Sequence, residues 1–228
     1  MLSMYPDLQA ASIQGTVYAA ALNFRADLSA LGERLGQAPY KAPPKAPVLY
    51  IRPANTWQSD GGRIELLAGE TEVQVAATLG LEIGTAAARV SEATALSHVR
   101  ALRMVNDVTL PHDSVFRPAI RQRCRDGFCP IGPPVPLPGP SASFNPGVVR
   151  TFLNDALLLE WSLADLVRSP ALLLADVSEF MTLLPGDILV LGAPRAAPRA
   201  RIGDRVRVEC AGVGSLQTTI TRSDGAPE

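Results

Sequence analysis

The sequence has 228 residues and a mass of 24.2 kDa, which suits one domain with a full hydrophobic core. Its formal net charge is −1 and it contains no basic block, which argues against a nucleic-acid partner. No apolar run is long enough to span a bilayer, and the first residues lack the pattern of a signal peptide, so no membrane partner is expected. We therefore expect a cytoplasmic protein.

The three cysteines do not match a known metal or disulfide pattern. Cys124 and Cys129 lie close together, but no second Cys/His pair stands at zinc-finger spacing, and Cys210 is left over. An odd and sparse set is also unlike a secreted disulfide scaffold. A zinc or redox site is the weaker alternative, and we expect ordinary thiols in the core or in a loop.

Short runs of β-branched and apolar residues, bounded by Gly, Pro and polar turns, predict many short strands. Residues 13–222 are expected to form a single domain, with tails at 1–12 and 223–228. The predicted strands are 15–23, 48–53, two within 63–83, 103–108, 147–153, 188–191, 205–212 and 216–221.

Few helices are expected between these strands. The spacing of apolar residues predicts a helix over 27–37 with Asp27 as its N-cap, and another over 91–99 that begins after Ser91. A longer helical pattern covers 162–180, where Pro170 should break or restart the helix. Together the elements favour an α+β fold, mainly β, built as a mixed β-sandwich or roll.

The central segment 123–134, RCRDGFCPIGPP, stands out between apolar stretches. Its two glycines allow backbone conformations closed to other residues, and its three prolines fix φ, so an ordered loop is expected. Ordered, charged loops on a rigid scaffold often carry function. We therefore expect this loop to belong to the active site.

A series of short motifs resembles the fumarylacetoacetate hydrolase family over roughly residues 14–221. The order of the motifs is more specific than any one of them. They are ALN at 21–23, LYIRP at 49–53, VND at 105–107, RDG at 125–127, LPGD at 184–187, GAP at 192–194, GDRV at 203–206 and GVG at 212–214.

A finer likeness concerns one branch of this family. Segments 39–45, 117–120 and 124–132 resemble the N-terminal half, or separate N-terminal-type subunit, of the bifunctional isomerase/decarboxylase of 4-hydroxyphenylacetate (homoprotocatechuate) breakdown. The resemblance implies decarboxylation of 5-oxopent-3-ene-1,2,5-tricarboxylate and isomerisation of 2-hydroxyhepta-2,4-diene-1,7-dioate. It also implies one Mg²⁺ or Mn²⁺, held by three carboxylates, that stabilises an enolate of the tri- or dicarboxylate substrate.

The metal ligands implied by the family are only partly present. Asp107 stands where the family has its third carboxylate, but Ala76 and Thr78 stand where it has a Glu-x-Glu pair. Glu70 and Glu72 have the same spacing but lie six residues earlier, about 20 Å away along an extended strand. They are ligands only under the alternative in which this chain binds metal by itself.

The resemblance also assigns the remaining site residues. Arg123 and Asp126 are expected to be catalytic, and Arg125, Arg52 and Asn106 are expected to bind substrate. An aspartate near two guanidinium groups could bind a dicarboxylate without a metal. A structural ion-pair network that braces the loop is an equally open alternative.

Other active-site positions differ from the family. Asp27 stands where the family has a catalytic His, and Ala193 replaces a substrate-binding Thr. His112 takes the place of a family Asp, and His98 lies in a predicted helix. A surface or structural role is expected for both histidines.

Three functional hypotheses follow. In the first, the chain is a subunit of the isomerase/decarboxylase and acts with a paralogous partner that keeps the metal ligands. In the second, it is an autonomous metal-dependent hydrolase or isomerase, alone or as a homo-oligomer, that uses Asp107 with Glu70 and Glu72. In the third, it is a non-catalytic scaffold subunit.

Overall fold

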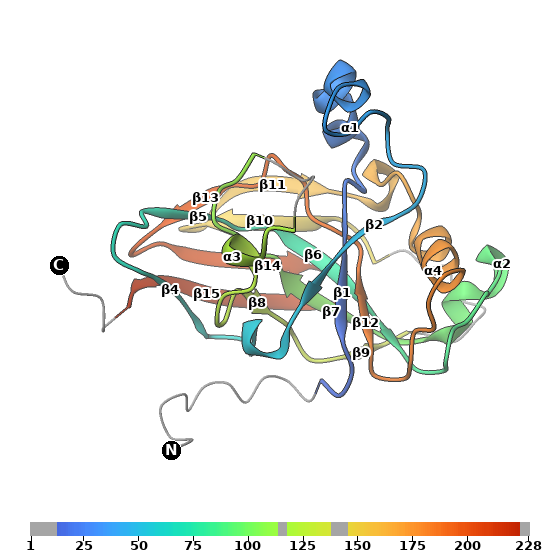
Figure 1. Cartoon of the computed structure of the whole chain (residues 1–228). Helices are drawn as coiled ribbons and strands as arrows, with labels where there is room; N and C mark the ends of the chain where they lie inside the picture. The colour runs from blue at the N-terminus through green and yellow to red at the C-terminus, as the bar shows by residue number, and fades with distance from the viewer. Residues whose placement is uncertain (1–12, 114–117, 138–145, 224–228) are drawn as a thin grey trace.

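The computed structural model describes residues 13–113, 118–137 and 146–223. Apart from Ser223, the expected tails lie outside these residues, and so does Arg117 of segment 117–120. Two sheets form the body of the molecule (Figure 1). In the described part of the chain, no helix has the length and apolar character needed to cross a bilayer.

The larger sheet has six strands in the order β2-β1-β12-β6-β7-β9. Strands β1 and β12 run parallel, and the other neighbours are antiparallel. Every residue of β6 is buried, as expected for a strand covered on both faces. The strands are β1 Val17–Ala21, β2 Val48–Arg52, β6 Ala77–Ile83, β7 Val99–Asn106, β9 Val135–Pro136 and β12 Ile188–Val190.

The second sheet has five strands in the order β11-β10-β14-β15-β4. Alternation along β14 turns Val206, Val208 and Cys210 into the core, as the sequence predicts. The strands are β4 Arg63–Leu66, β10 Val149–Leu153, β11 Ala156–Trp161, β14 Arg205–Cys210 and β15 Gly214–Arg222. Two small pairs join β5 Glu72–Gln74 to β13 Arg199–Arg201, and β3 Trp57–Gln58 to β8 Cys129–Pro130.

The main core lies between the two sheets. Leu81 and Met104 of the six-stranded sheet share one apolar cluster with Val208 and Leu216 of the five-stranded sheet. A second cluster, which includes Val105, covers the opposite face of β7. Burial of both faces fixes the position of β7 and of the residues that follow it. The predicted α+β, mainly β sandwich is confirmed.

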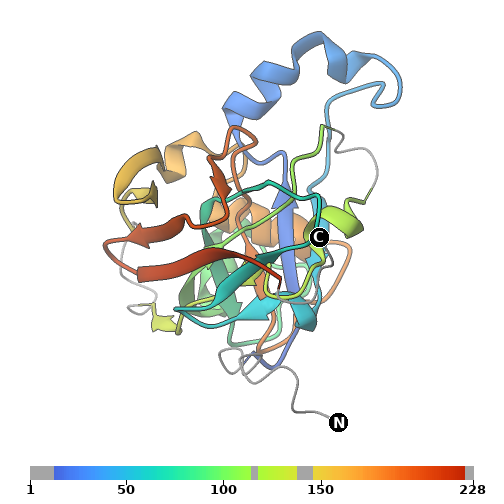
Figure 2. The ribbon, with the colours of Figure 1, turned by 90° about the vertical axis from the view of Figure 1, so that its left-hand side faces the viewer.

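The helices are short and lie around the sheets. Helix α1 stands away from the sheets in both views (Figures 1 and 2), while α2 and α4 lie side by side at another end (Figure 1). The α-helices are α1 Arg25–Leu31, α2 Glu92–Ala95, α3 Ile120–Arg123 and α4 Pro170–Ser178. The 3₁₀ turns are η1 Gly32–Gly36, η2 Ala54–Thr56, η3 Leu96–His98 and η4 Leu163–Asp165.

Helix boundaries confirm two predictions and correct one. Helix α4 starts at Pro170, with the Ser169 hydroxyl accepting from Leu172 N–H at 3.1 Å, and Ser91 is the residue before α2. The prediction that Asp27 caps the first helix is wrong, because α1 begins two residues earlier. Asp27 is instead buried in the first turn and accepts a hydrogen bond from a distant backbone amide, that of Arg195.

Candidate functional site

A cavity of about 220 Å³ opens beside the end of β1, and its wall is built by segments far apart in the sequence. Tyr50 of β2, Asp107 after β7 and Arg123 of α3 line one part of it. Another part is lined by Ala193, Pro194, Arg195, Ala197 and, from β13, Arg199. The sheet therefore brings the ends of several strands and the central loop to one place.

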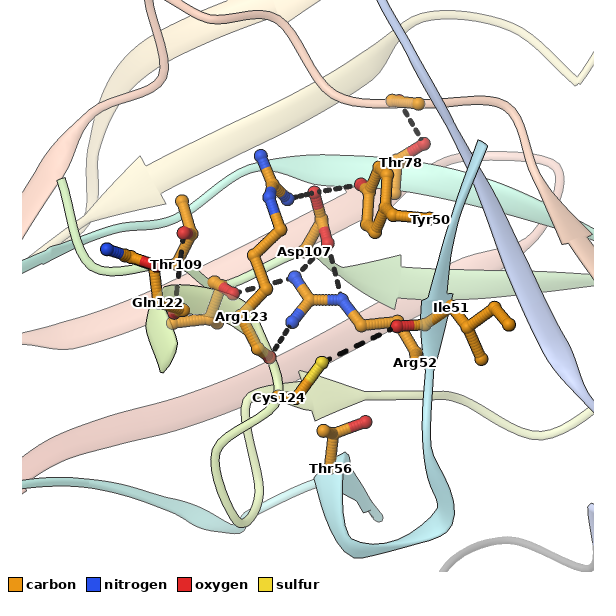
Figure 3. A network of polar contacts seen from close by, with 12 residues as sticks. Tyr50, Ile51, Arg52, Thr56, Thr78, Asp107, Thr109, Gln122, Arg123 and Cys124 are labelled. Atoms are coloured by element: carbon orange, nitrogen blue, oxygen red, sulfur yellow. Dashed lines mark hydrogen bonds and ion pairs between the residues drawn. The ribbon is translucent and has the colours of Figure 1, made fainter. Parts of the chain in front are cut away.

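Asp107 is the centre of a dense polar network (Figure 3). Its Oδ1 accepts from Arg52 Nε at 3.0 Å and from Arg52 Nη2, and its Oδ2 accepts from Tyr50 Oη at 2.7 Å and Arg123 Nη1 at 2.9 Å. Burial opposes ionisation of this carboxyl group. The charges of Arg52 and Arg123 outweigh burial, however, and lower the pKa of Asp107 to about 2. Asp107 is therefore a carboxylate at neutral pH.

Arg52 holds Asp107 from within the core. Its side chain is completely buried, and besides Asp107 it donates to the backbone carbonyl oxygens of Val108, at 2.7 Å, and Arg123. Burial lowers the pKa of Arg52, but the neighbouring Asp107 charge more than reverses this effect and keeps the guanidinium protonated. Arg52 does not line the cavity. It therefore positions Asp107 and Arg123.

Arg123 faces the cavity from the last turn of α3. Its side chain is 19% exposed, and its guanidinium carbon lies 4.4 Å from the centre of the Tyr50 ring. Burial and the nearby Asp107 raise the pKa of Tyr50, so the phenol stays neutral and continues to donate to Asp107. A stacked and ion-paired arginine is fixed in one direction. Arg123 thus offers an oriented positive group to the cavity.

The two positions that hold glutamates in the family serve other purposes here. Ala76 lines the cavity with a methyl group, and its carbonyl oxygen accepts from Asp107 N–H at 2.9 Å. A longer acid at position 76 would therefore lie beside Asp107. The buried Thr78 hydroxyl donates to Gly192 O at 2.5 Å, which fixes the segment that leads to Ala193 (Figure 3).

The structure separates Glu70 and Glu72 from Asp107. Glu70 forms an ion pair with Arg125, and Glu72 forms one with Arg199. Neither glutamate lines the cavity. The alternative ligand set of Asp107, Glu70 and Glu72 is therefore not assembled.

The residues at the cavity do not fit the divalent cation that the family implies. Within the described ranges, no three His, Cys, Asp or Glu side chains converge as a metal cage. Both oxygens of Asp107 already accept from Arg52, Arg123 or Tyr50. The neighbouring guanidinium charges would also repel a cation. Asp107 is an ion-pair partner in this structure.

Several expected site residues lie outside the cavity. Arg125 pairs with Glu70 and lies 5.3 Å from the Phe128 ring, while the exposed Asp126 accepts from Asn55 Nδ2 at 2.7 Å. Asn106 is buried and donates to Thr218 Oγ1 at 3.2 Å. These contacts brace the central loop and β7. Of the acidic and basic groups expected from sequence, the structure brings Asp107 and Arg123 to the cavity.

The thiols of the central loop take no part in the site. All three cysteines are free, and burial raises the pKa of the Cys129 thiol to about 12. Cys124 makes a weak contact of 3.7 Å with Ile51 O (Figure 3). Cys129 and Cys210 are buried, and Cys124 lies half-buried in the central loop.

The cavity also contains groups that the sequence pattern did not identify. Arg195 lies in the cavity wall and directly follows the GAP motif, so the motif pointed to this part of the chain. Arg199 also lies in the wall, but no motif in the sequence indicates a functional role for it. His112, which takes the place of a family Asp and was expected to have a surface or structural role, also lies in the cavity wall, where burial and the charges of Arg123 and Arg195 lower its pKa. His98, in contrast, is half-buried away from the cavity, and its Nδ1 lies 2.9 Å from Ala86 O, in line with the expected structural role.

Comparison with known proteins identifies the family. Residues 16–221 match the family described as fumarylacetoacetate (FAA) hydrolase C-terminal. The chain belongs to the fumarylacetoacetate hydrolase family. It is 42% identical over 208 residues to the 4-hydroxyphenylacetate degradation bifunctional isomerase/decarboxylase of Escherichia coli, covering 91% of this chain and 47% of that protein. The enzyme of the same name from Salmonella dublin is 40% identical over 212 residues, covering 93% and 48%.

This family member therefore spans about half the length of these curated relatives. Among solved structures it resembles the 5-carboxymethyl-2-hydroxymuconate delta-isomerase of Mycobacterium smegmatis, with a TM-score of 0.75, 25% identity and coverage of 92% of this chain and 80% of that one. The fumarylpyruvate hydrolase of Pseudomonas aeruginosa, solved with Mn²⁺ and pyruvate, has a TM-score of 0.76 at 19% identity, with coverage of 91% and 90%. That second likeness concerns the fold alone.

Proposed function

We propose that this chain is one half of an isomerase/decarboxylase assembly in the breakdown of 4-hydroxyphenylacetate. It would act in the cytoplasm on the products of aromatic ring cleavage, 5-oxopent-3-ene-1,2,5-tricarboxylate and 2-hydroxyhepta-2,4-diene-1,7-dioate. The other half would be a second chain of the same family that carries the Glu-x-Glu pair and the catalytic His. The proposal rests on identity of 40–42% to bifunctional enzymes that are about twice as long.

One observation carries the division of labour. Asp107 occupies the position of a family metal ligand, but it forms ion pairs with Arg52 and Arg123. The neighbouring cavity residue Ala76 has no carboxylate that could bind a metal with it. We therefore assign the metal-dependent step to the second chain. This chain would contribute Arg123 as a group that binds a substrate carboxylate, with Asp107 and Arg52 as positioning residues.

Reconstitution tests this proposal. The chain, the family member with the Glu-x-Glu pair, and an equimolar mixture of both would be assayed for decarboxylation and isomerisation, and their association followed by size-exclusion chromatography. We expect no turnover by this chain alone, co-elution of the two chains, and turnover by the mixture above that of the second chain. Turnover by this chain alone with Mg²⁺ would contradict the proposal, as would failure of the chains to associate.

A variant separates a substrate-binding subunit from a scaffold. We expect Arg123→Met to lower turnover by the assembled pair while the two chains still co-elute. Arg150→Met is the matched control, because the ion pair that Arg150 forms among the described residues is an exposed one, with Glu160 at 3.4 Å. Equal turnover by both variants would support the scaffold hypothesis.

A further inference from the structure

We propose that the cavity beside Asp107 binds a small organic dicarboxylate directly through Arg123 and Arg195, without a divalent cation. This inference deepens the proposed function, since it states how this chain would hold an acidic substrate. It concerns binding by the isolated chain and requires neither a partner nor turnover. Its failure can therefore be distinguished from failure of the proposed assembly.

The charge of the cavity wall favours an anion. The negative charge of Asp107 is shared between two arginines, the buried Arg52 and the wall residue Arg123, so this group of three carries a net positive charge. Arg195 and Arg199 add two more cations to the wall, and Arg199 is paired with Glu72. Asp113 adds a second wall carboxylate, and Arg195 Nη2 donates to the backbone carbonyl oxygen of Asp113 at 3.0 Å. Two guanidinium groups can thus be presented to a ligand.

Both arginines are held in place before a ligand arrives. Arg123 is fixed by its bond to Asp107 and by its stacking on Tyr50. The backbone at Arg195 is fixed by the buried Asp27, whose carboxylate oxygens accept from Arg195 N–H at 3.0 and 3.2 Å. Groups that are already ordered lose less conformational entropy on binding. This contact gives Asp27 a structural role, although Asp27 does not cap helix α1.

The size and lining of the cavity restrict the ligand. A volume of about 220 Å³ is small compared with the roughly 300–1,000 Å³ of drug-binding pockets. Gln74 and Thr109 add neutral polar groups to the wall, and Ala76 and Ala193 add small apolar surfaces. A short, planar acid with a carboxylate at each end matches this pattern. One end would meet Arg123 and the other would meet Arg195.

Titration calorimetry of the full chain in metal-free buffer with EDTA tests the inference, using fumarate as the probe. Crotonate is the matched control ligand, because it keeps the planar four-carbon frame but has only one carboxylate. We expect fumarate to bind, and crotonate to bind at least about tenfold more weakly, since loss of one charge-assisted contact costs about 1.5–3 kcal/mol.

Variants then locate the site. We expect Arg195→Met and Arg123→Met each to weaken fumarate binding by about tenfold or more, and Arg150→Met to leave it unchanged. Arg195→Met tests the site even if Arg123→Met does not fold, because the Arg195 side chain takes no part in the Asp107 network. The inference is overturned by absence of fumarate binding, by binding that requires Mn²⁺, or by equal affinity of wild type and Arg195→Met.

Discussion

Arg52→Met is the substitution that most directly probes the buried ion pair. The Arg52 and Asp107 side chains are 0% and 3% exposed, and Arg52 also satisfies the Val108 carbonyl oxygen. Removing one partner of a buried pair costs about 3–5 kcal/mol. In Arg52→Met the Asp107 carboxylate keeps Arg123 and Tyr50 as partners, which moderates the loss, while the Val108 carbonyl oxygen loses its donor, which adds to it. Methionine fills much of the volume, so a cavity contributes little.

Urea unfolding followed by fluorescence and circular dichroism measures this loss. Arg205→Met is the control, because Arg205 and Asp155 lie 3.5 Å apart with side chains 73% and 79% exposed. A pair of this kind contributes about 0–1 kcal/mol. We expect Arg52→Met to cost several times more than the control.

A double variant identifies the cause of the loss. Arg52→Met with Asp107→Leu removes both buried charges, so we expect it to be more stable than Arg52→Met alone. Arg123 is partly exposed and can turn to solvent when Asp107 is replaced. The reasoning is refuted if Arg52→Met costs no more than Arg205→Met, or if the double variant is less stable than the single one.

Three further predictions follow from the same contacts. The folded pKa of Asp107, about 2, lies below its ordinary value of 3.8. The ionised carboxylate therefore contributes about 2 kcal/mol to the free energy of unfolding above pH 5, and this contribution is lost as the pH falls through 2. In an acid titration of stability, Asp107→Asn should lose less free energy of unfolding than wild type. Glu82→Gln should cost about 3 kcal/mol more in urea unfolding than Glu160→Gln, because Glu82 is buried against two arginines and Glu160 is exposed. Gly192→Ala should destabilise the protein far more than Gly203→Ala, although both glycines have positive φ. A Cβ at Gly192 would lie 2.5 Å from the Ala20 carbonyl oxygen, whereas a Cβ at Gly203 would have no heavy atom within 4 Å. Equal loss of stability for the two glutamate variants or for the two glycine variants would contradict the corresponding prediction. So would an equal loss of stability in acid for wild type and Asp107→Asn.

The sequence predicted most strands because their signal is local. Alternation along β14 and the apolar run of β12 both survive in the structure. Strand β11 was missed, because Leu157 and Leu158 lie at an exposed edge and do not alternate with polar residues. The Asp27 cap was wrong because the partner of that carboxylate, Arg195, is 168 residues away.

The sequence predicted only part of the site, because several of its contacts join residues far apart in the chain. Motif order marked Asp107 and Arg123, and alignment placed Ala76 at a family ligand position, next to Asp107 in the structure. Nothing local indicated that Arg52 would be fully buried and would hold the carboxylate. Arg195 enters the cavity through contacts that form only when the distant segments fold together.

Equilibrium dialysis of the isolated chain against Mn²⁺ tests the central claim most directly. Asp107 is held by two guanidinium groups and a phenol, so we expect no stoichiometric Mn²⁺ to remain on the chain, with or without fumarate. The contrary result would be one Mn²⁺ bound per chain and lost in Asp107→Asn. That outcome would show that Asp107 is a metal ligand and that the arginines move aside.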